Sequence, residues 1–230
     1  MPAVYLDYNA STPVDPAVAA AMRPLLETAF GNPSSGHWAS GAAKSTLEHA
    51  RGQVAALLGA SADEVVFTSG GSEANNLALK GAFFARRDRG SHIITTAVEH
   101  PAVLRPCQFL EKLGATLTIL PVDRFGRVDP DAVRRAITSR TILISVMHAN
   151  NEVGTIQPLA EIAALARAHG IFFHTDAAQS VGKISTLGAV RFSLGRGTTE
   201  AEMDAVAERL RQVLGTNNAS ARPTSASLHA

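Results

Sequence analysis

Four short segments of the sequence combine glycine, ionisable and amide residues in patterns that could form a binding or catalytic site. They are residues 68–73 (TSGGSE), 98–104 (VEHPAVL), 148–155 (HANNEVGT) and 174–179 (HTDAAQ). Each follows a run of apolar or β-branched residues that is typical of a buried strand. Open α/β sheets bind ligands at the carboxyl ends of their strands, so we expect the four segments to meet there.

The glycine-containing turn at residues 68–73 is a candidate phosphate site. Gly70 and Gly71 let the backbone approach a ligand closely, and a helix is expected to begin at Ser72. Free N–H groups at a helix start, together with the helix dipole, favour an anion. An ordinary βα turn with a serine cap explains the same residues, and such turns are common.

The other three segments each have two interpretations. The Asp176 carboxylate could pair with a protonated ring nitrogen, or it could simply cap a helix. A metal bound by His174 and Asp176 lacks a clear third ligand, so no metal site is predicted. His100 could stack on a flat ligand or cap the helix that follows it. The amides of Asn150 and Asn151 need partners if they are buried, and an Asx-turn network would supply them.

The elements that must position these residues alternate between strands and helices. Strands are expected at 64–68, 92–96, 115–122, 141–147 and 171–174, and helices at 72–86, 102–113, from Asp129-Pro130 onward and at 158–169. This order predicts an α/β fold with a mostly parallel sheet and helices on both faces.

The regions on either side of this block follow different patterns. An N-terminal pair of helices is expected from Asp15-Pro16, with Pro24 bending or shortening the first, and at 41–58, before Gly59. After the block come a strand-like run at 189–194, a helix from a capping box at 199–202 to about 214, and a disordered tail at 215–230.

Composition bounds the class of protein. The 230 residues are 46% hydrophobic and 18% charged with a net charge of +1, as in an ordinary globular protein. The sequence has no long basic run of the kind that indicates nucleic-acid binding, and no apolar stretch is long enough to cross a membrane. No signal peptide is expected at the start of the sequence. Cys107 is the only cysteine, which excludes an intramolecular disulfide and fits a cytoplasmic location.

Seven segments in the same order resemble motifs of the class V aminotransferases, most closely the cysteine desulfurases of the NifS and IscS type. They are YLDYNASTP, FGNPSSGHWASG, FTSGGSEANNLALKG, TTAVEHPAVL, HANNEVGTIQP, HTDAAQSVGK and VRFSLGRGTTEAEMD. The resemblance covers residues 4–186 and 188–214. It implies an N-terminal arm (1–15), an incomplete large domain like that of pyridoxal-phosphate-dependent transferases (16–186), and a remnant of a small α+β domain (187–214).

The resemblance also implies a role for individual residues. Gly71 and Ser72 would hold the phosphate of pyridoxal 5'-phosphate, and His100 would stack on its ring and shuttle protons. Asp176 would pair with the pyridinium nitrogen and let the ring act as an electron sink. The remaining implied contacts are those of Asn151 and Gln179 with the phenolic oxygen, and of Arg191, with Asn32 nearby, with the substrate carboxylate.

Two catalytic groups of that family have no counterpart in these 230 residues. The family's Schiff-base lysine lies in a Ser-Gly-His-Lys segment, whereas the lysines here are Lys44, Lys80, Lys112 and Lys183. The mobile loop with the nucleophilic cysteine is also missing, as if a segment were deleted between Thr186 and Leu187. Cys107 is expected to be a buried, unreactive helix residue. We therefore expect non-covalent cofactor binding at best.

Three functional interpretations follow. The resemblance implies a desulfurase that converts L-cysteine to L-alanine and enzyme-bound sulfur for iron–sulfur cluster or thio-cofactor assembly. The alternatives are a catalytically inactive protein that binds the cofactor or dimerises, and a non-functional deletion product. The implied partners are a second copy or a full-length relative, and a sulfur-accepting scaffold protein.

Overall fold

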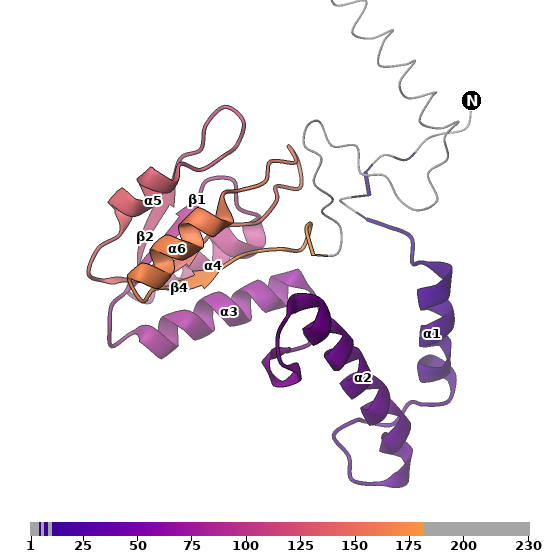
Figure 1. Ribbon diagram of the computed structural model, residues 1–230. Coiled ribbons are helices and arrows are strands. Elements are labelled where there is room, and N and C mark those ends of the chain that lie inside the picture. Colours follow the sequence, from indigo (N-terminus) through magenta and orange to yellow (C-terminus); the bar gives the residue numbers. More distant parts are fainter. Residues whose placement is uncertain (1–4, 6, 9–10, 182–230) are drawn as a thin grey trace, which may run out of the picture. The chain divides into compact units, whose positions relative to one another are not determined.

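A parallel sheet of four strands organises the described part of the protein (Figure 1). The computed structural model describes residues 5, 7, 8 and 11–181. The strands are β1 (His92–Thr96), β2 (Thr116–Leu120), β3 (Thr141–Ser145) and β4 (Phe172–His174), and their order in the sheet is β2-β1-β3-β4. Every neighbouring pair is parallel. The predicted parallel sheet is therefore confirmed.

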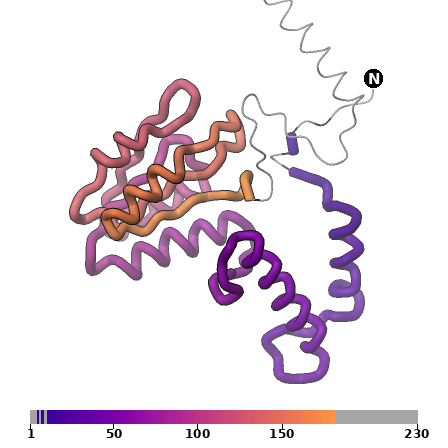
Figure 2. Tube along the Cα trace, in the orientation of Figure 1, coloured from indigo at the N-terminus to yellow at the C-terminus, as the bar shows by residue number. Residues whose placement is uncertain are grey.

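Helices cover both faces of this sheet. Adjacent residues of a strand point to opposite faces, so the buried neighbours of each residue show which helices cover which face. Ile93 and Leu143 belong to one buried cluster, with residues of α3 (Gly71–Arg86) and α4 (Pro101–Glu111). Their neighbours Ile94 and Ile144 belong to a second cluster, with residues of α5 (Pro130–Ala136) and α6 (Leu159–Ala168). The chain trace in Figure 2 follows this alternation of strand and helix from α3 to β4.

The N-terminal segment forms the two expected helices, α1 (Pro16–Glu27) and α2 (Gly41–Leu58). Asp15 caps α1 by accepting a hydrogen bond of 2.8 Å from the N–H of Ala17. The helix continues for three residues beyond Pro24, so Pro24 lies inside the helix and does not end it. Gly59 ends α2 in the left-handed conformation, at φ 66°, which glycine adopts without steric cost.

The prediction of a strand at residues 64–68 is wrong. A short 3₁₀ helix, η2 (Ala62–Glu64), precedes extended backbone that pairs with no other described strand. Val66 and Phe67 are 67% and 45% exposed. Their β-branched and aromatic character favours extended backbone, but a strand also needs a neighbour to accept its hydrogen bonds. Among the described residues, this stretch meets α2 through Arg51, whose guanidinium donates to the Val65 carbonyl and lies over the Phe67 ring, and it has no ladder of strand hydrogen bonds.

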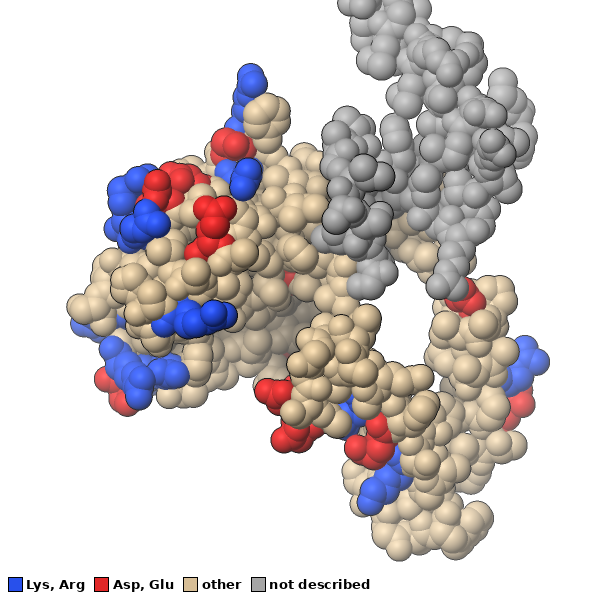
Figure 3. Space-filling view, in the orientation of Figure 1, with Lys and Arg blue, Asp and Glu red and all other residues tan. Residues whose placement is uncertain are grey.

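Several predictions concern residues outside the described ranges. These are Arg191 and Lys183, the strand and helix expected between 189 and 214, and the tail from 215. The described elements belong to one unit, Val14–Arg191. None of the described helices is both long and apolar enough to cross a membrane. On the face drawn in Figure 3, basic and acidic side chains are mixed, with no large surface of one sign.

Candidate functional site

The segments that follow β1, β3 and β4 are joined to one another at the carboxyl edge of the sheet. Glu99, after β1, accepts a hydrogen bond of 2.9 Å from the backbone N–H of Met147, after β3. The Asn150 side chain donates to the carbonyl oxygen of Val98 at 3.1 Å. The backbone N–H of His148 donates to the carbonyl oxygen of Asp176 at 2.9 Å. Three of the four segments singled out in the sequence therefore meet as expected.

The Asp176 carboxylate has two hydrogen-bond donors, one from its own loop and one from α3. Its Oδ1 accepts from the N–H of Ala178 at 3.0 Å, as in a helix-capping or Asx-type turn. Its Oδ2 accepts from the side-chain amide of Asn75 at 2.9 Å. Asn75 is 5% exposed and lies in the second turn of α3, 101 positions away in the sequence. This bond brings the fourth segment, at the start of α3, to the same edge.

The N-terminus of α3 is open to an acceptor. Gly70 precedes the helix, and no side chain of the described residues caps it. Gly71 and Ser72 occupy the first turn, where backbone N–H groups have no partner within the helix. Glu73 turns back to accept bonds of 2.6 Å from the N–H and the hydroxyl of Ser69, and these bonds lower the pKa of Glu73. Gly71 and Ser72 are exposed, and first-turn N–H groups of this kind favour an anionic ligand.

His100 is the N-cap residue just before α4, and it is exposed. Its Nδ1 accepts a hydrogen bond of 3.0 Å from the N–H of Ala102, so the capping interpretation of His100 is confirmed. In the neutral ring this bond leaves the proton on Nε2. Capping also fixes the orientation of the ring, so it is compatible with a second role against a flat ligand.

Glu99 is a buried carboxyl group that the sequence did not single out. Its Oε1 accepts from the Thr96 hydroxyl at 2.7 Å and from the N–H of Met147, while Oε2 has no hydrogen-bond partner among the described residues. Burial raises the pKa of Glu99 to about 7, and the negative charge of Asp176 adds to the effect. Near neutral pH, Glu99 is therefore partly in the uncharged form.

The loop after β3 is organised by Asn150. Its Oδ1 accepts from the N–H groups of Glu152 and Val153 at 2.9 and 3.0 Å, which confirms the expected Asx turn. Asn151, the predicted cofactor contact, is half-buried beside it, and Gln179 is half-buried in the loop after Asp176. The polarity of the segment was a signal for both asparagines, but the sequence could not tell which one organises the loop.

Of the two residues predicted to contact substrate, Asn32 is the one that the structure describes, and it is not joined to this edge. Asn32 is exposed between α1 and α2, and its Oδ1 accepts a local hydrogen bond of 2.9 Å from the N–H of Ser34. No interaction within the described ranges links Asn32 to the loops after β1, β3 or β4. Arg191 lies outside those ranges.

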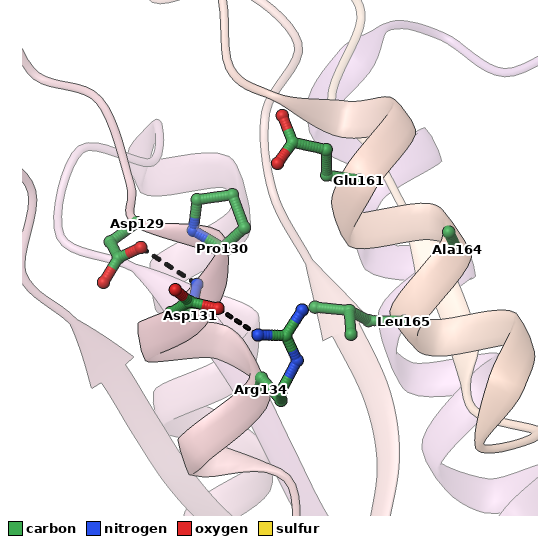
Figure 4. Close-up of a pocket in the computed structure, with 7 residues that line it drawn as sticks. All are labelled: Asp129, Pro130, Asp131, Arg134, Glu161, Ala164 and Leu165. Carbon is green, nitrogen blue, oxygen red and sulfur yellow. Dashed lines mark hydrogen bonds and ion pairs between the residues drawn. The ribbon is translucent and has the colours of Figure 1, made fainter.

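A hollow between α5 and α6 is separate from these residues (Figure 4). It is lined by Asp129, Pro130, Asp131, Arg134, Glu161, Ala164 and Leu165. Arg134 is paired with Asp131, and Asp129 caps α5. None of the predicted site residues lines this hollow. Among the described residues, no group of three or more His, Cys, Asp or Glu side chains could hold a metal ion, and the hollow does not supply one.

Two groups at the sheet edge can bind ligand groups of opposite charge. An anionic group fits the uncapped start of α3, and a cationic nitrogen fits Asp176. One helix connects these two points, since the Asn75 that bonds to Asp176 follows Gly71 by four positions. The exposed ring of His100 lies on the loop that Glu99 joins to β3. Hydrogen bonds thus join the start of α3, the loop of Asp176 and the loop of His100 at one edge of the sheet.

Comparison with known proteins gives the family. The aminotransferase class-V family matches residues 4–187. The chain belongs to this family. It is 55% identical over 181 residues to the cysteine desulfurase IscS of Dictyoglomus turgidum, a match that covers 79% of this chain and 46% of the relative. The IscS of Methanosarcina thermophila is 50% identical over 182 residues, which cover 79% of this chain and 45% of the relative.

Solved structures agree with these relatives. A structure of SspA in complex with cysteine superposes with a TM-score of 0.74 at 45% identity, covering 76% of this chain and 51% of that one. A NifS-like protein gives a TM-score of 0.76 at 38% identity, covering 79% and 50%. The chain spans about half the length of the relatives that it matches.

Proposed function

We propose that this chain holds pyridoxal 5'-phosphate, the cofactor of cysteine desulfurases, at the carboxyl edge of its sheet, and that it does so without a covalent bond. The observation that supports this most directly is the contact between Asn75 and Asp176. That contact places a carboxylate beside the helix whose N-terminus is uncapped. The family membership supplies the identity of the ligand.

The donors and acceptors present match the cofactor group by group. The first-turn N–H groups at Gly71 and Ser72 would bind the phosphate, aided by the dipole of a 16-residue helix. Asp176 would accept a hydrogen bond from the pyridinium nitrogen, and His100 would lie against the ring. Asn151 and Gln179 are the proposed contacts of the phenolic oxygen. When bound, the cofactor supplies an electron sink for chemistry at the carbon next to an amine.

The covalent and nucleophilic parts of desulfurase chemistry have no counterpart among the described residues. Lys44 lies on α2, Lys80 has its ammonium group over the Phe109 ring at 4.7 Å, and Lys112 caps α4. Cys107 is fully buried in α4, and burial raises the pKa of its thiol to about 12. A thiolate is the nucleophilic form, so Cys107 is not suited to accept sulfur.

L-cysteine is the substrate that the desulfurase relatives imply, and Arg191 with Asn32 is the proposed carboxylate contact. We propose a cytoplasmic setting, with a second copy or a full-length relative as partner. A sulfur-accepting scaffold protein is proposed from the family resemblance alone.

Titration with pyridoxal phosphate, followed by absorbance, tests the assignment. Wild-type chain should bind saturably, and Asp176→Ala should weaken binding by at least about tenfold, the loss expected for one charged hydrogen bond. Asp88→Asn is the matched control, because Asp88 is an exposed carboxylate just after α3 and away from the sheet edge. Equal affinity of wild type and Asp176→Ala would remove Asp176 from the site.

A further inference from the structure

We propose that Asn75 is a positioning residue of the cofactor site, whose side-chain amide holds the Asp176 carboxylate in register with the N-terminus of α3. The inference rests on the proposed cofactor role and adds to it a residue that acts through Asp176. Asn75 would not touch the cofactor itself.

The geometry that supports this role is specific. The Asn75 Nδ2 donates to the Asp176 Oδ2 at 2.9 Å, while the other carboxylate oxygen accepts from Ala178 at 3.0 Å. One donor to each oxygen fixes the rotation of the carboxylate. With the carboxylate held in this orientation, the lone pairs that are not used by the two bonds point in fixed directions. A ring nitrogen can therefore donate to Asp176 only from those directions.

The position of Asn75 on α3 gives the bond its functional meaning. Asn75 follows Gly71 by four residues, about one helical turn, which is a rise of roughly 6 Å. The same rigid helix therefore presents first-turn N–H groups at its start and holds Asp176 one turn later. A movement of α3 along its axis would shift both points together and preserve the spacing between them.

The burial of Asn75 indicates that its amide group has a specific role. Asn75 is 5% exposed, in a helix whose other buried side chains are Leu79 and Phe83. A buried amide needs its hydrogen bonds, and an apolar residue would pack at this position without that requirement. The amide therefore serves the carboxylate of Asp176. The competing explanation is that the bond only ties α3 to the loop after β4.

A pair of ligands separates these two explanations. The probes are pyridoxal phosphate and its analogue in which carbon replaces the ring nitrogen, and the readout is the dissociation constant of each. Asn75→Leu keeps the approximate size of the side chain and removes the donor. Asn75→Leu should raise the dissociation constant of pyridoxal phosphate about tenfold, the loss expected for one hydrogen bond to a charged group. The analogue cannot use Asp176, so its dissociation constant should stay within about twofold.

The control variant and a second background make the test decisive. Gln108→Leu removes an exposed side-chain amide on α4 that accepts a hydrogen bond from Arg105 and lies outside the proposed site, and it should change neither constant. In an Asp176→Asn background, Asn75→Leu should cause no further loss for pyridoxal phosphate. Circular dichroism identifies a variant that fails to fold, and Asn75→Ser, a smaller polar residue, then replaces Asn75→Leu in both comparisons.

Two outcomes would overturn the inference. Equal weakening of both ligands by Asn75→Leu would make Asn75 a structural clamp, and unchanged binding of both would remove it from the site. Either result leaves the proposed function standing. Failure of the wild-type chain to bind pyridoxal phosphate at all would overturn the proposed function, and this inference with it.

Discussion

Glu99 and Met147 are joined by a hydrogen bond of 2.9 Å, in which a buried carboxylate oxygen accepts from the backbone N–H of the neighbouring strand's loop. The bond ties the loop that ends at His100 to the loop that leads to Asn150. The second oxygen of Glu99 has no partner within the described ranges, which makes ionisation of this group costly.

Glu99→Gln should therefore change how stability depends on pH. The pKa of Glu99 is raised from 4.5 to about 7 in the folded chain, so its contribution is fully present below pH 4.5 and is lost as pH rises through 7. One pKa unit corresponds to about 1.4 kcal/mol, so the loss is on the order of 3 kcal/mol. The free energy of unfolding of wild type and of Glu99→Gln is measured with urea at pH 5 and at pH 8. The difference, variant minus wild type, should be larger at pH 8 than at pH 5 by a similar amount.

Glu161→Gln is the matched control for that experiment. Glu161 is exposed in the first turn of α6, and its substitution should leave the difference between pH 5 and pH 8 unchanged. If wild type and Glu99→Gln show parallel pH profiles, the raised pKa of Glu99 is wrong.

His92 should contribute to stability with the opposite sign. It lies buried in β1, and its two ring nitrogens each contact a threonine hydroxyl at 2.8 Å, Thr118 on β2 and Thr141 on β3. Burial lowers the pKa of His92 below 6.5. Its contribution is thus present above pH 6.5 and is lost as pH falls from 6.5 toward the folded pKa.

His92→Gln should reduce this loss on the acid side and lower stability at pH 7.5 by about 1–3 kcal/mol, because the threonine hydroxyls lose a fitted partner. Urea unfolding at pH 5.5 and 7.5 is the measurement. His169→Gln, at an exposed histidine on the C-cap of α6, is the comparison. His174, whose pKa is also lowered by burial, retains its own acid-side contribution in both variants. An unchanged acid-side slope in His92→Gln would contradict the assignment.

Cys107 should be unreactive in the folded chain. It is fully buried among Leu79, Phe83 and Val103, and burial raises the pKa of its thiol to about 12. A thiol-specific disulfide reagent at pH 8 should label it only as fast as the chain opens, and rapidly in urea. Cys107→Ala should bind pyridoxal phosphate as wild type does. Rapid, stoichiometric labelling of the folded chain would show that the thiol is accessible.

The order of elements was predictable because hydrophobic period and turn chemistry are local. Gly114 and Gly170 adopt positive φ, of 97° and 63°, at the ends of α4 and α6, as glycine at those positions predicted. The prediction of a strand at 64–68 was wrong because residue types favour extended backbone, whereas a strand also needs a neighbouring strand to pair with. No local pattern records which strands pair.

The candidate site was predictable in its segments more than in its contacts. The sequence singled out Asp176 and His100 through their positions after strands, and the structure joins their segments. It did not single out Asn75 or Glu99. Asn75 is one of two adjacent asparagines on a helix, and only its burial against Asp176 distinguishes it from Asn76. Long-range contacts of this kind leave no spacing signal.

Whether the chain holds pyridoxal phosphate reversibly is tested most directly by equilibrium dialysis over a range of cofactor concentrations, with and without borohydride before exhaustive dialysis. We predict saturable retention of the cofactor and its complete release afterwards in both samples, with an unmodified intact mass. Absence of retention would contradict cofactor binding at Asp176 and α3. A stoichiometric reduced adduct on a single lysine, Lys183 above all, would contradict non-covalent binding.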